Sequence, residues 1–111
     1  MIATQHWDTL KWTAVRPGVE RKVIFTSSTK LQLIRFQPGN EINPHKHDHE
    51  QIAYILSGTL DYHVADENND LVVHRMVTGS VLAIPAGALH YGQNAGSEPV
   101  LNLDIFPIGE R

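Results

Sequence analysis

The segment that decides the fold runs from Gly39 to Gly58 and reads GNEINPHKHDHEQIAYILSG. It places three histidines and a glutamine directly before an apolar run. Imidazole nitrogens bind Zn, Cu, Fe and Ni, and side chains two positions apart on an extended chain point to the same side. His45 and His47 are therefore a candidate pair of metal ligands. Gln51 is a candidate third ligand, with His49 as its competitor, and a solvated loop tip is the alternative interpretation of the pattern.

Composition limits the classes of function. A chain of 111 residues predicts one domain with one core. A formal net charge of −3 without a basic run argues against nucleic acid or an anionic membrane as the main partner and leaves neutral or small polar partners open. There is no cysteine, so any metal must be held by nitrogen and oxygen donors. No segment has the pattern of a signal peptide or a membrane span, and we expect a cytoplasmic protein.

Short apolar runs bounded by turn residues predict an all-β fold, a sandwich or barrel, because no window has helical periodicity. The predicted strands cover residues 19–25, 31–36, 52–56, 59–64, 71–77, 80–84 and 100–106. Residues 52–56 are apolar throughout, which predicts a strand covered on both faces, whereas residues 59–64 alternate, which predicts a half-exposed strand. Residues 1–15 carry Trp7 and Trp12 without periodicity and predict an N-terminal arm, followed by a barrel domain over residues 16–111.

Two motifs resemble those of the cupin superfamily. The first has the spacing G-x₅-H-x-H-x₃-Q-x₆-G, with Gln where most members carry Glu, and is formed by Gly39, His45, His47, Gln51 and Gly58. The second has the spacing G-x₅-P-x-G-x₂-H-x₃-N and is formed by Gly79, Pro85, Gly87, His90 and Asn94. The resemblance implies a double-stranded β-helix, or jelly-roll barrel, that holds one divalent transition metal (Fe, Ni, Mn, Zn or Cu). The ligands that it implies are His45, His47, Gln51 and His90.

A neutral glutamine in place of a carboxylate changes the expected chemistry of this metal. Three imidazoles and a carboxamide leave a divalent ion its full charge. We therefore expect a stronger Lewis acid that binds anionic oxygens well and is itself held less tightly.

Further resemblance points to the small single-domain cupins of pectin degradation, which convert cyclic 4,5-unsaturated uronates into linear keto forms. It rests on Pro17-Gly18-Val19 with Arg21-Lys22, on residues 45–51, and on the closing run from Leu103 to Phe106. The resemblance implies a metal-assisted isomerase whose substrate is an anionic or polyhydroxylated small molecule. It also implies a homodimer in which sheet edges or N-terminal segments are exchanged.

Asp104 is the candidate acid/base, because opening a hemiacetal and ketonising an enol are both proton transfers. If Asp104 points inward from its apolar strand, burial raises its pKa. Alternation places Leu101, Leu103 and Ile105 on one face of the strand and Asp104 with Phe106 on the other. Both orientations of Asp104 remain open at this level.

The remaining pocket candidates are an aromatic wall, a carboxylate-binding arginine and two tyrosines. Phe106 is the candidate wall, and Tyr54 and Tyr91 are candidates to line the cavity. The family carries an arginine near the C-terminus, where this chain has Arg111, and Arg35 is an alternative that could reach into the barrel. We expect surface positions without a role for His6, His63 and His74.

Two other classes of function compete with the isomerase. The same kind of barrel loaded with iron can activate O₂, so an iron-dependent dioxygenase acting on a small molecule is one alternative. A non-catalytic module that binds a sugar or another small ligand is the other, because fold does not determine function.

Overall fold

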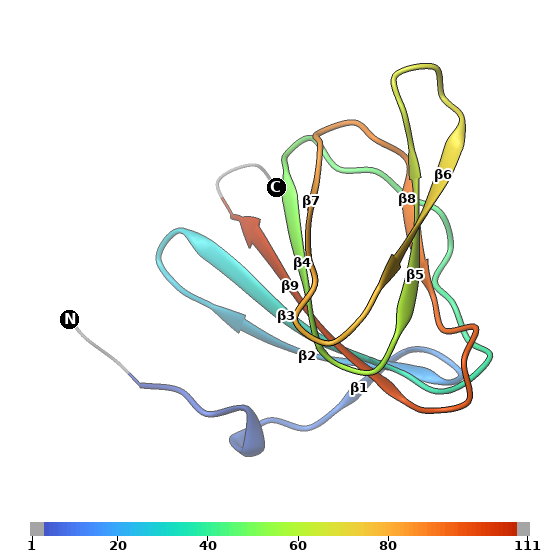
Figure 1. The fold of residues 1–111 in the computed structure, drawn as a ribbon. Helices are drawn as coiled ribbons and strands as arrows, with labels where there is room; N and C mark the ends of the chain where they lie inside the picture. The colour runs from blue at the N-terminus through green and yellow to red at the C-terminus, as the bar shows by residue number, and fades with distance from the viewer. Residues whose placement is uncertain (1–3, 109–111) are drawn as a thin grey trace.

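The protein is an antiparallel β-sandwich with one short 3₁₀ turn, η1 (Trp7–Thr9), in a computed structural model that describes residues 4–108 (Figure 1). Six strands form one sheet in the order β1-β2-β3-β9-β4-β7, and three form the other in the order β6-β5-β8. The strands are β1 (Thr13–Arg16), β2 (Val19–Phe25), β3 (Thr29–Phe36), β4 (Gln51–Ser57), β5 (Leu60–Ala65), β6 (Leu71–Met76), β7 (Val81–Ile84), β8 (His90–Gln93) and β9 (Val100–Pro107). This architecture confirms the predicted jelly-roll fold.

All seven predicted strands are present, and two further strands were missed. β1 is exposed along its length and forms because its backbone pairs with β2. β8 has the sequence HYGQ and pairs with β5. Gly92 in its centre leaves room for Phe36 and Leu60, whose atoms lie 3.3 and 3.2 Å from where a Cβ would stand. Neither segment has an apolar alternation, so only tertiary pairing reveals them.

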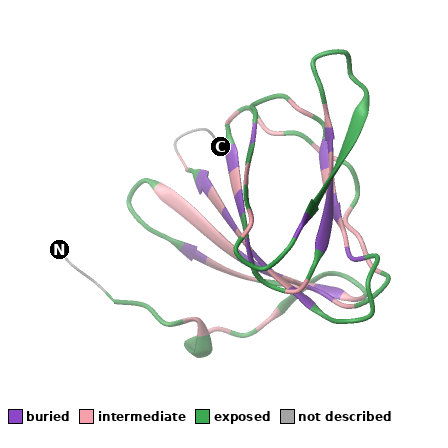
Figure 2. Ribbon diagram, viewed as in Figure 1, coloured by how far each residue is buried: buried purple, intermediate pink, exposed green. Residues whose placement is uncertain are grey.

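The core fills the space between the two sheets, and Figure 2 shows buried positions on β4, β5 and β9. Its largest fully buried apolar side chains include Phe36, Ile55 and Leu60. The same interior also contains buried polar side chains on β4, β8 and β9, namely Gln51, His90, Asn102 and Asp104. Burying polar groups is unfavourable unless they are hydrogen-bonded, so these residues mark the candidate site.

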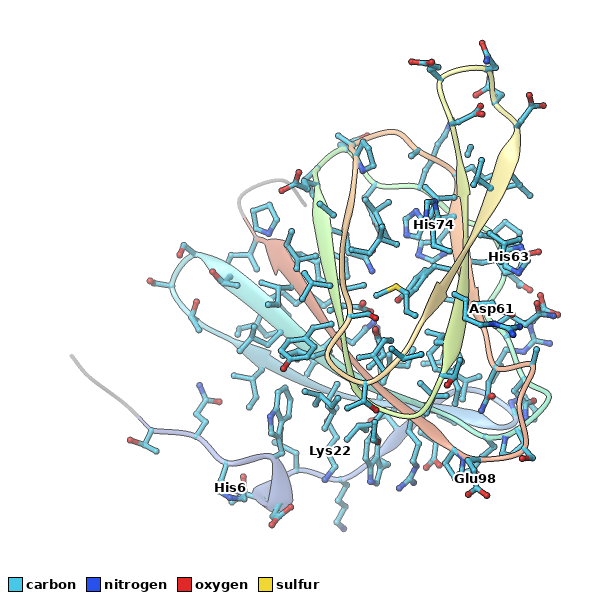
Figure 3. The ribbon with its side chains drawn as sticks, in the orientation of Figure 1. His6, Lys22, Asp61, His63, His74 and Glu98 are labelled. Carbon is cyan, nitrogen blue, oxygen red and sulfur yellow. The ribbon has the colours of Figure 1, made fainter. Side chains whose placement is uncertain are left out.

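Two predictions of strand exposure were wrong. The outer side of β4 is not covered by the described residues, and Tyr54 and Leu56 there are 39% and 37% exposed. In β5 the inward side is apolar as predicted, but the outward side is also covered. Asp61 is only 8% exposed because Arg75 pairs with it through two hydrogen bonds, and His63 is stacked on an aromatic ring of the neighbouring strand. Figure 3 shows Asp61 and His63 on the outer side of the smaller sheet.

The N-terminal segment packs on the outer side of the larger sheet. Lys22 Nζ donates a hydrogen bond to the Trp7 carbonyl, and the Trp12 ring lies beneath both Lys22 and the Arg35 guanidinium, 4.8 and 4.1 Å from its centroid. β1 begins at Thr13, inside the segment predicted as an arm. The domain boundary at residue 16 and the homodimer stay predictions. Among the described residues no helix is long and apolar enough to cross a membrane.

Candidate metal centre

Three histidines from two distant segments meet in the interior. His45 and His47 lie in the loop before β4, and His90 is the first residue of β8. The backbones of His45 and His90 form an antiparallel bridge with N–H···O distances of 3.0 and 2.9 Å in the two directions. One ring nitrogen of each of the three histidines lies within 4.8 Å of those of the other two. The structure therefore brings together the three histidines that the motifs singled out.

Backbone carbonyls determine which ring nitrogens face the centre. His45 Nδ1 lies 2.9 Å from the Asn43 carbonyl, and His90 Nδ1 lies 2.8 Å from the Ala88 carbonyl. A carbonyl only accepts, so both Nδ1 atoms carry the proton and both Nε2 atoms present a lone pair, as in metal-binding histidines. His47 Nε2 is buried and has no hydrogen-bond partner among the described residues.

Gln51 presents its oxygen to the same centre. Gln51 Nε2 donates to Asp104 Oδ1 at 2.9 Å, which turns Gln51 Oε1 toward His90 Nε2 at 3.1 Å. Because the proton of His90 is on Nδ1, two lone pairs face each other across this buried contact. Such a contact is unfavourable unless a cation lies between the two atoms. The donor set thus fits a metal ion.

His49 does not join this group of ligand atoms. Its ring stacks on His47 at 5.2 Å, and its Nδ1 lies 3.2 Å from the Glu50 carbonyl. Of the two candidates for the third position that the sequence left open, the geometry favours Gln51.

Burial favours the neutral form of His47 and His90. It lowers the pKa of His47 to about 4, assisted by the positive charges that His45, His90, His49 and Lys30 carry when protonated. Burial also lowers the pKa of His90, with a smaller contribution from His45. Neutral imidazole is the form that binds metal, so the lowered pKa values of His47 and His90 favour metal binding at neutral pH.

Asp104 points into the interior from β9 and is 4% exposed. Its Oδ1 accepts hydrogen bonds from Gln51, Tyr62 and Asn102 at 2.9, 3.3 and 2.7 Å, and its Oδ2 accepts one from Gln32 at 3.2 Å. Burial raises the pKa of Asp104, and these four hydrogen bonds offset part of that rise. A carboxyl group held in one orientation with a raised pKa is suited to proton transfer.

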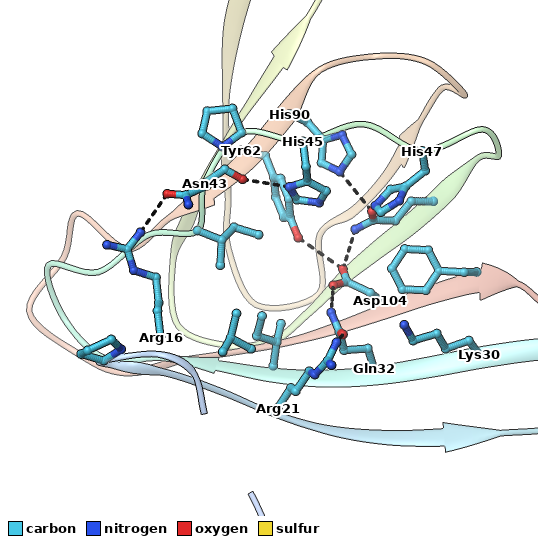
Figure 4. A pocket seen from close by; sticks show the side chains of 17 residues that line it. Arg16, Arg21, Lys30, Gln32, Asn43, His45, His47, Tyr62, His90 and Asp104 are labelled. Carbon is cyan, nitrogen blue, oxygen red and sulfur yellow. Dashed lines mark hydrogen bonds between the residues drawn. The ribbon is translucent and has the colours of Figure 1, made fainter. Parts of the chain in front are cut away.

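A cavity of about 550 Å³ opens over the histidines and Asp104 (Figure 4). Arg16, Arg21 and Lys30 line it from the β1–β3 side, and Asp104 is the one acidic group among its described lining residues. Sequence reasoning missed these cations. Alternation along β2 groups Arg21 with Val19 and Val23, but the other face carries the buried Ile24, so the sequence alone does not mark the face of Arg21 as the inward one.

Only one of the other predicted pocket residues lines this cavity. Phe106 does, with its ring edge-on to His47 at a centroid distance of 5.3 Å. The other three lie on outer faces. The structure corrects their placement: Arg35 pairs with Glu20 at 2.8 Å, Tyr91 stacks on His63 at 4.3 Å, and Tyr54 is exposed on β4. Arg111 lies outside the described residues.

Comparisons with known proteins agree with this geometry. The sequence profile described as "Cupin domain" matches residues 32–106. Germin-like protein subfamily 2 member 1 of Arabidopsis thaliana is 32% identical over 82 residues, which cover 73% of this chain but only 37% of that protein. The chain thus spans little more than a third of the length of this curated relative.

Two solved structures show the same fold. KdgF from Halomonas sp. superposes with a TM-score of 0.83 and 23% identity, covering 100% of this chain and 96% of that one. Oxalate decarboxylase of Lactobacillus farciminis, as its formate complex, superposes with a TM-score of 0.81 and 25% identity, covering 91% of this chain and 32% of that one.

Proposed function

The chain belongs to the cupin domain family, and from that premise we propose that it is a metal-dependent isomerase that opens and ketonises a small sugar acid such as a 4,5-unsaturated uronate. The observation that carries the proposal is the position of Asp104. This buried carboxyl group faces a cavity rimmed by cations and is joined through Gln51 to the histidine cluster. The full-length likeness to KdgF from Halomonas sp. and the motif resemblance to pectin-degradation cupins support the same choice.

The ligand set determines what a metal would contribute. A divalent transition ion held by His45, His47, His90 and Gln51 would act as a Lewis acid toward substrate oxygens. Since all four side chains are neutral, none of them reduces the charge of that ion. Asp104, the one carboxylate among the described residues that line the cavity, is bonded to the Gln51 amide nitrogen and is not among these ligands.

The reaction is an isomerisation, so no atom is gained or lost. The anomeric hydroxyl gives up its proton and the ring oxygen takes one up as the bond between the anomeric carbon and the ring oxygen breaks, which leaves an aldehyde and an enol. The enol then becomes a ketone when its hydroxyl loses a proton and the neighbouring alkene carbon gains one. Proton removal and proton delivery can both be performed by one carboxyl group whose pKa lies close to the working pH.

The surroundings of Asp104 suit that task. Four donors hold its two oxygens in one orientation, and the carboxyl group is only 4% exposed. This fixed orientation holds the carboxyl group against one part of the ligand. In well-oriented reactions such positioning lowers the activation barrier by up to about 7–11 kcal/mol.

The proposal is tested by adding unsaturated galacturonate, prepared with a pectate lyase, to the metal-loaded protein. We expect ultraviolet absorbance of the alkene to fall and a keto product to appear in the NMR spectrum, in wild type but not in Asp104→Asn. Stoichiometric consumption of oxygen by the iron-loaded protein would instead favour the dioxygenase. Binding of the uronate without any change in it would favour the binding module.

A further inference from the structure

We propose that Arg21 forms an anion subsite that receives the carboxylate of the ligand, so that the acid group faces the β2–β3 wall while the hydroxyl groups face the histidines. The inference rests on the proposed function in taking the ligand to be a sugar acid. It adds the residue that recognises the acid and the direction in which the ligand lies.

Arg21 is placed to reach the cavity and to bind an anion there. It lies on the inward side of β2, opposite Ile34 on β3, and its side chain is exposed at the cavity wall. Arg21 Nη1 donates to Gln32 Oε1 at 3.0 Å. This bond uses one of several N–H donors of the guanidinium, and the others are in a plane that suits bidentate binding of a carboxylate.

Hydrogen bonds connect Arg21 through Gln32 and Asp104 to Gln51, which lies against the histidine cluster (Figure 4). Gln32 accepts from Arg21 through Oε1 and donates through Nε2 to Asp104 Oδ2 at 3.2 Å. Asp104 Oδ1 accepts from Gln51, whose Oε1 lies against His90 Nε2. A ligand lying along these hydrogen bonds with its acid group at Arg21 brings its middle carbons over Asp104 and its hydroxyl groups to the histidines.

The charges of the cavity favour an anion at this wall. Arg16, Arg21 and Lys30 line it, while Asp104 is the one acidic lining residue among those described. The histidines and Gln51 carry no compensating negative charge. Clefts lined by one sign of charge raise the local concentration of the opposite sign and select ligands accordingly.

Of the three cations, Arg21 is the one that the geometry selects. Along β3 the position opposite Arg21 is four residues from Lys30, a distance of about 13 Å at 3.3 Å per residue. Arg16 is held at the hairpin end by Asn43 at 3.2 Å, and the Lys30 ammonium lies 5.5 Å from the centroid of the Phe106 ring. Only the arginine between them is hydrogen-bonded to the side chain that holds Asp104.

The test measures binding of D-galacturonate and D-galactose to the metal-loaded protein by calorimetry. The two sugars differ in the acid group, so their affinity ratio isolates its recognition. Arg21→Gln is expected to weaken galacturonate binding by at least about tenfold and to leave galactose binding unchanged, as expected for loss of charge-assisted hydrogen bonds. Arg21→Lys keeps the charge but not the bidentate geometry, so its affinity for galacturonate is expected to lie between those of wild type and Arg21→Gln.

Lys22→Gln is the matched control. It removes the same charge one position along β2, where the side chain points outward and donates to the Trp7 carbonyl. We expect this variant to bind both sugars as wild type does. Metal content and the midpoint of thermal unfolding, measured for every variant, report whether the fold and the metal centre are intact.

Kinetics with unsaturated galacturonate separate the subsite from the proposed function. A recognition role predicts that Arg21→Gln raises KM in proportion to the loss of galacturonate affinity; a fall in kcat alone would mean that Arg21 only positions Gln32 and Asp104, and would overturn the subsite. Unchanged galacturonate affinity, equal losses for both sugars, or no binding of galacturonate to wild type would overturn it too. If wild type prefers galacturonate through Arg21 but turns over no uronate, the subsite stands and the isomerase proposal fails.

Discussion

Replacing His90 by alanine tests the metal centre most directly. The imidazole is 1% exposed and its Nε2 faces Gln51 Oε1, so its removal deletes one of the proposed ligands from the inside of the barrel. The backbone hydrogen bonds between His90 and His45 do not involve the side chain and remain available to alanine. We therefore expect His90→Ala to fold without binding metal.

The expected changes in the free energy of unfolding distinguish loss of metal binding from loss of the fold. Without metal, the variant loses the hydrogen bond to the Ala88 carbonyl and some packing, a cost of about 1–2 kcal/mol in the free energy of unfolding. With metal at about a thousand times its dissociation constant, wild type gains about 4 kcal/mol. At about 4 °C per kcal/mol for a domain of this size, metal should raise the unfolding midpoint of wild type by roughly 15 °C.

The assay is thermal unfolding with and without added metal, together with metal analysis of protein purified without chelator. We expect the metal-dependent shift to be present in wild type and absent in His90→Ala. His63→Ala is the matched control, since His63 is a β5 residue that hydrogen-bonds to Gln93 outside the cavity, and it should retain the full shift. An equal shift in His90→Ala and wild type, or full metal content in that variant, would refute the ligand set.

Three further predictions concern the acid/base, an ion pair and a turn. Asp104→Asn should lower the rate of uronate turnover by about 10²–10⁴-fold with unchanged metal content, because it removes proton transfer but no proposed ligand; turnover at the wild-type rate would contradict the assignment. Arg75 lowers the pKa of Asp61 below its ordinary value of 3.8, so the pair stabilises the fold above that pH and the contribution is lost as pH falls through the folded-state pKa. We would measure the unfolding free energies of wild type and Asp61→Asn by urea titration at a series of pH values. Their difference should be constant from roughly pH 5 to 8 and become smaller at lower pH. A difference that does not change with pH would count against the ion pair. Gly58→Ala should cost at least about 2 kcal/mol, because Gly58 has φ 90° and an added Cβ would lie 2.8 Å from the Pro99 carbonyl oxygen. Gly39→Ala, at φ 79° in open space, should cost only about 1 kcal/mol, and equal urea midpoints for the two variants would contradict this reasoning.

Local patterns predicted most of the fold and the histidines of the site. Turn residues and apolar runs located seven of the strands because each signal lies within a few consecutive residues. The first motif places its histidines in the loop before β4, and the second places His90 at the start of β8. These strands belong to different sheets, and His45 and His90 meet through an isolated antiparallel bridge. β1 and β8 were missed because backbone pairing with β2 and β5 forms them without any apolar pattern of their own.

Local sequence patterns located seven of the nine described strands, the turns between them, and the side chains that share a face of each strand. Which of those faces is the interior depends on how the strands pair and pack. Alternation grouped Asp104 with Phe106, and the pairing of β9 between β3 and β4 turned both inward. The packing of the sheets likewise places Arg21 at the cavity and Arg35 on the outer face, although each is a single arginine within a strand. The two faces of an isolated strand are equivalent, and the face against which the second sheet packs becomes the buried one.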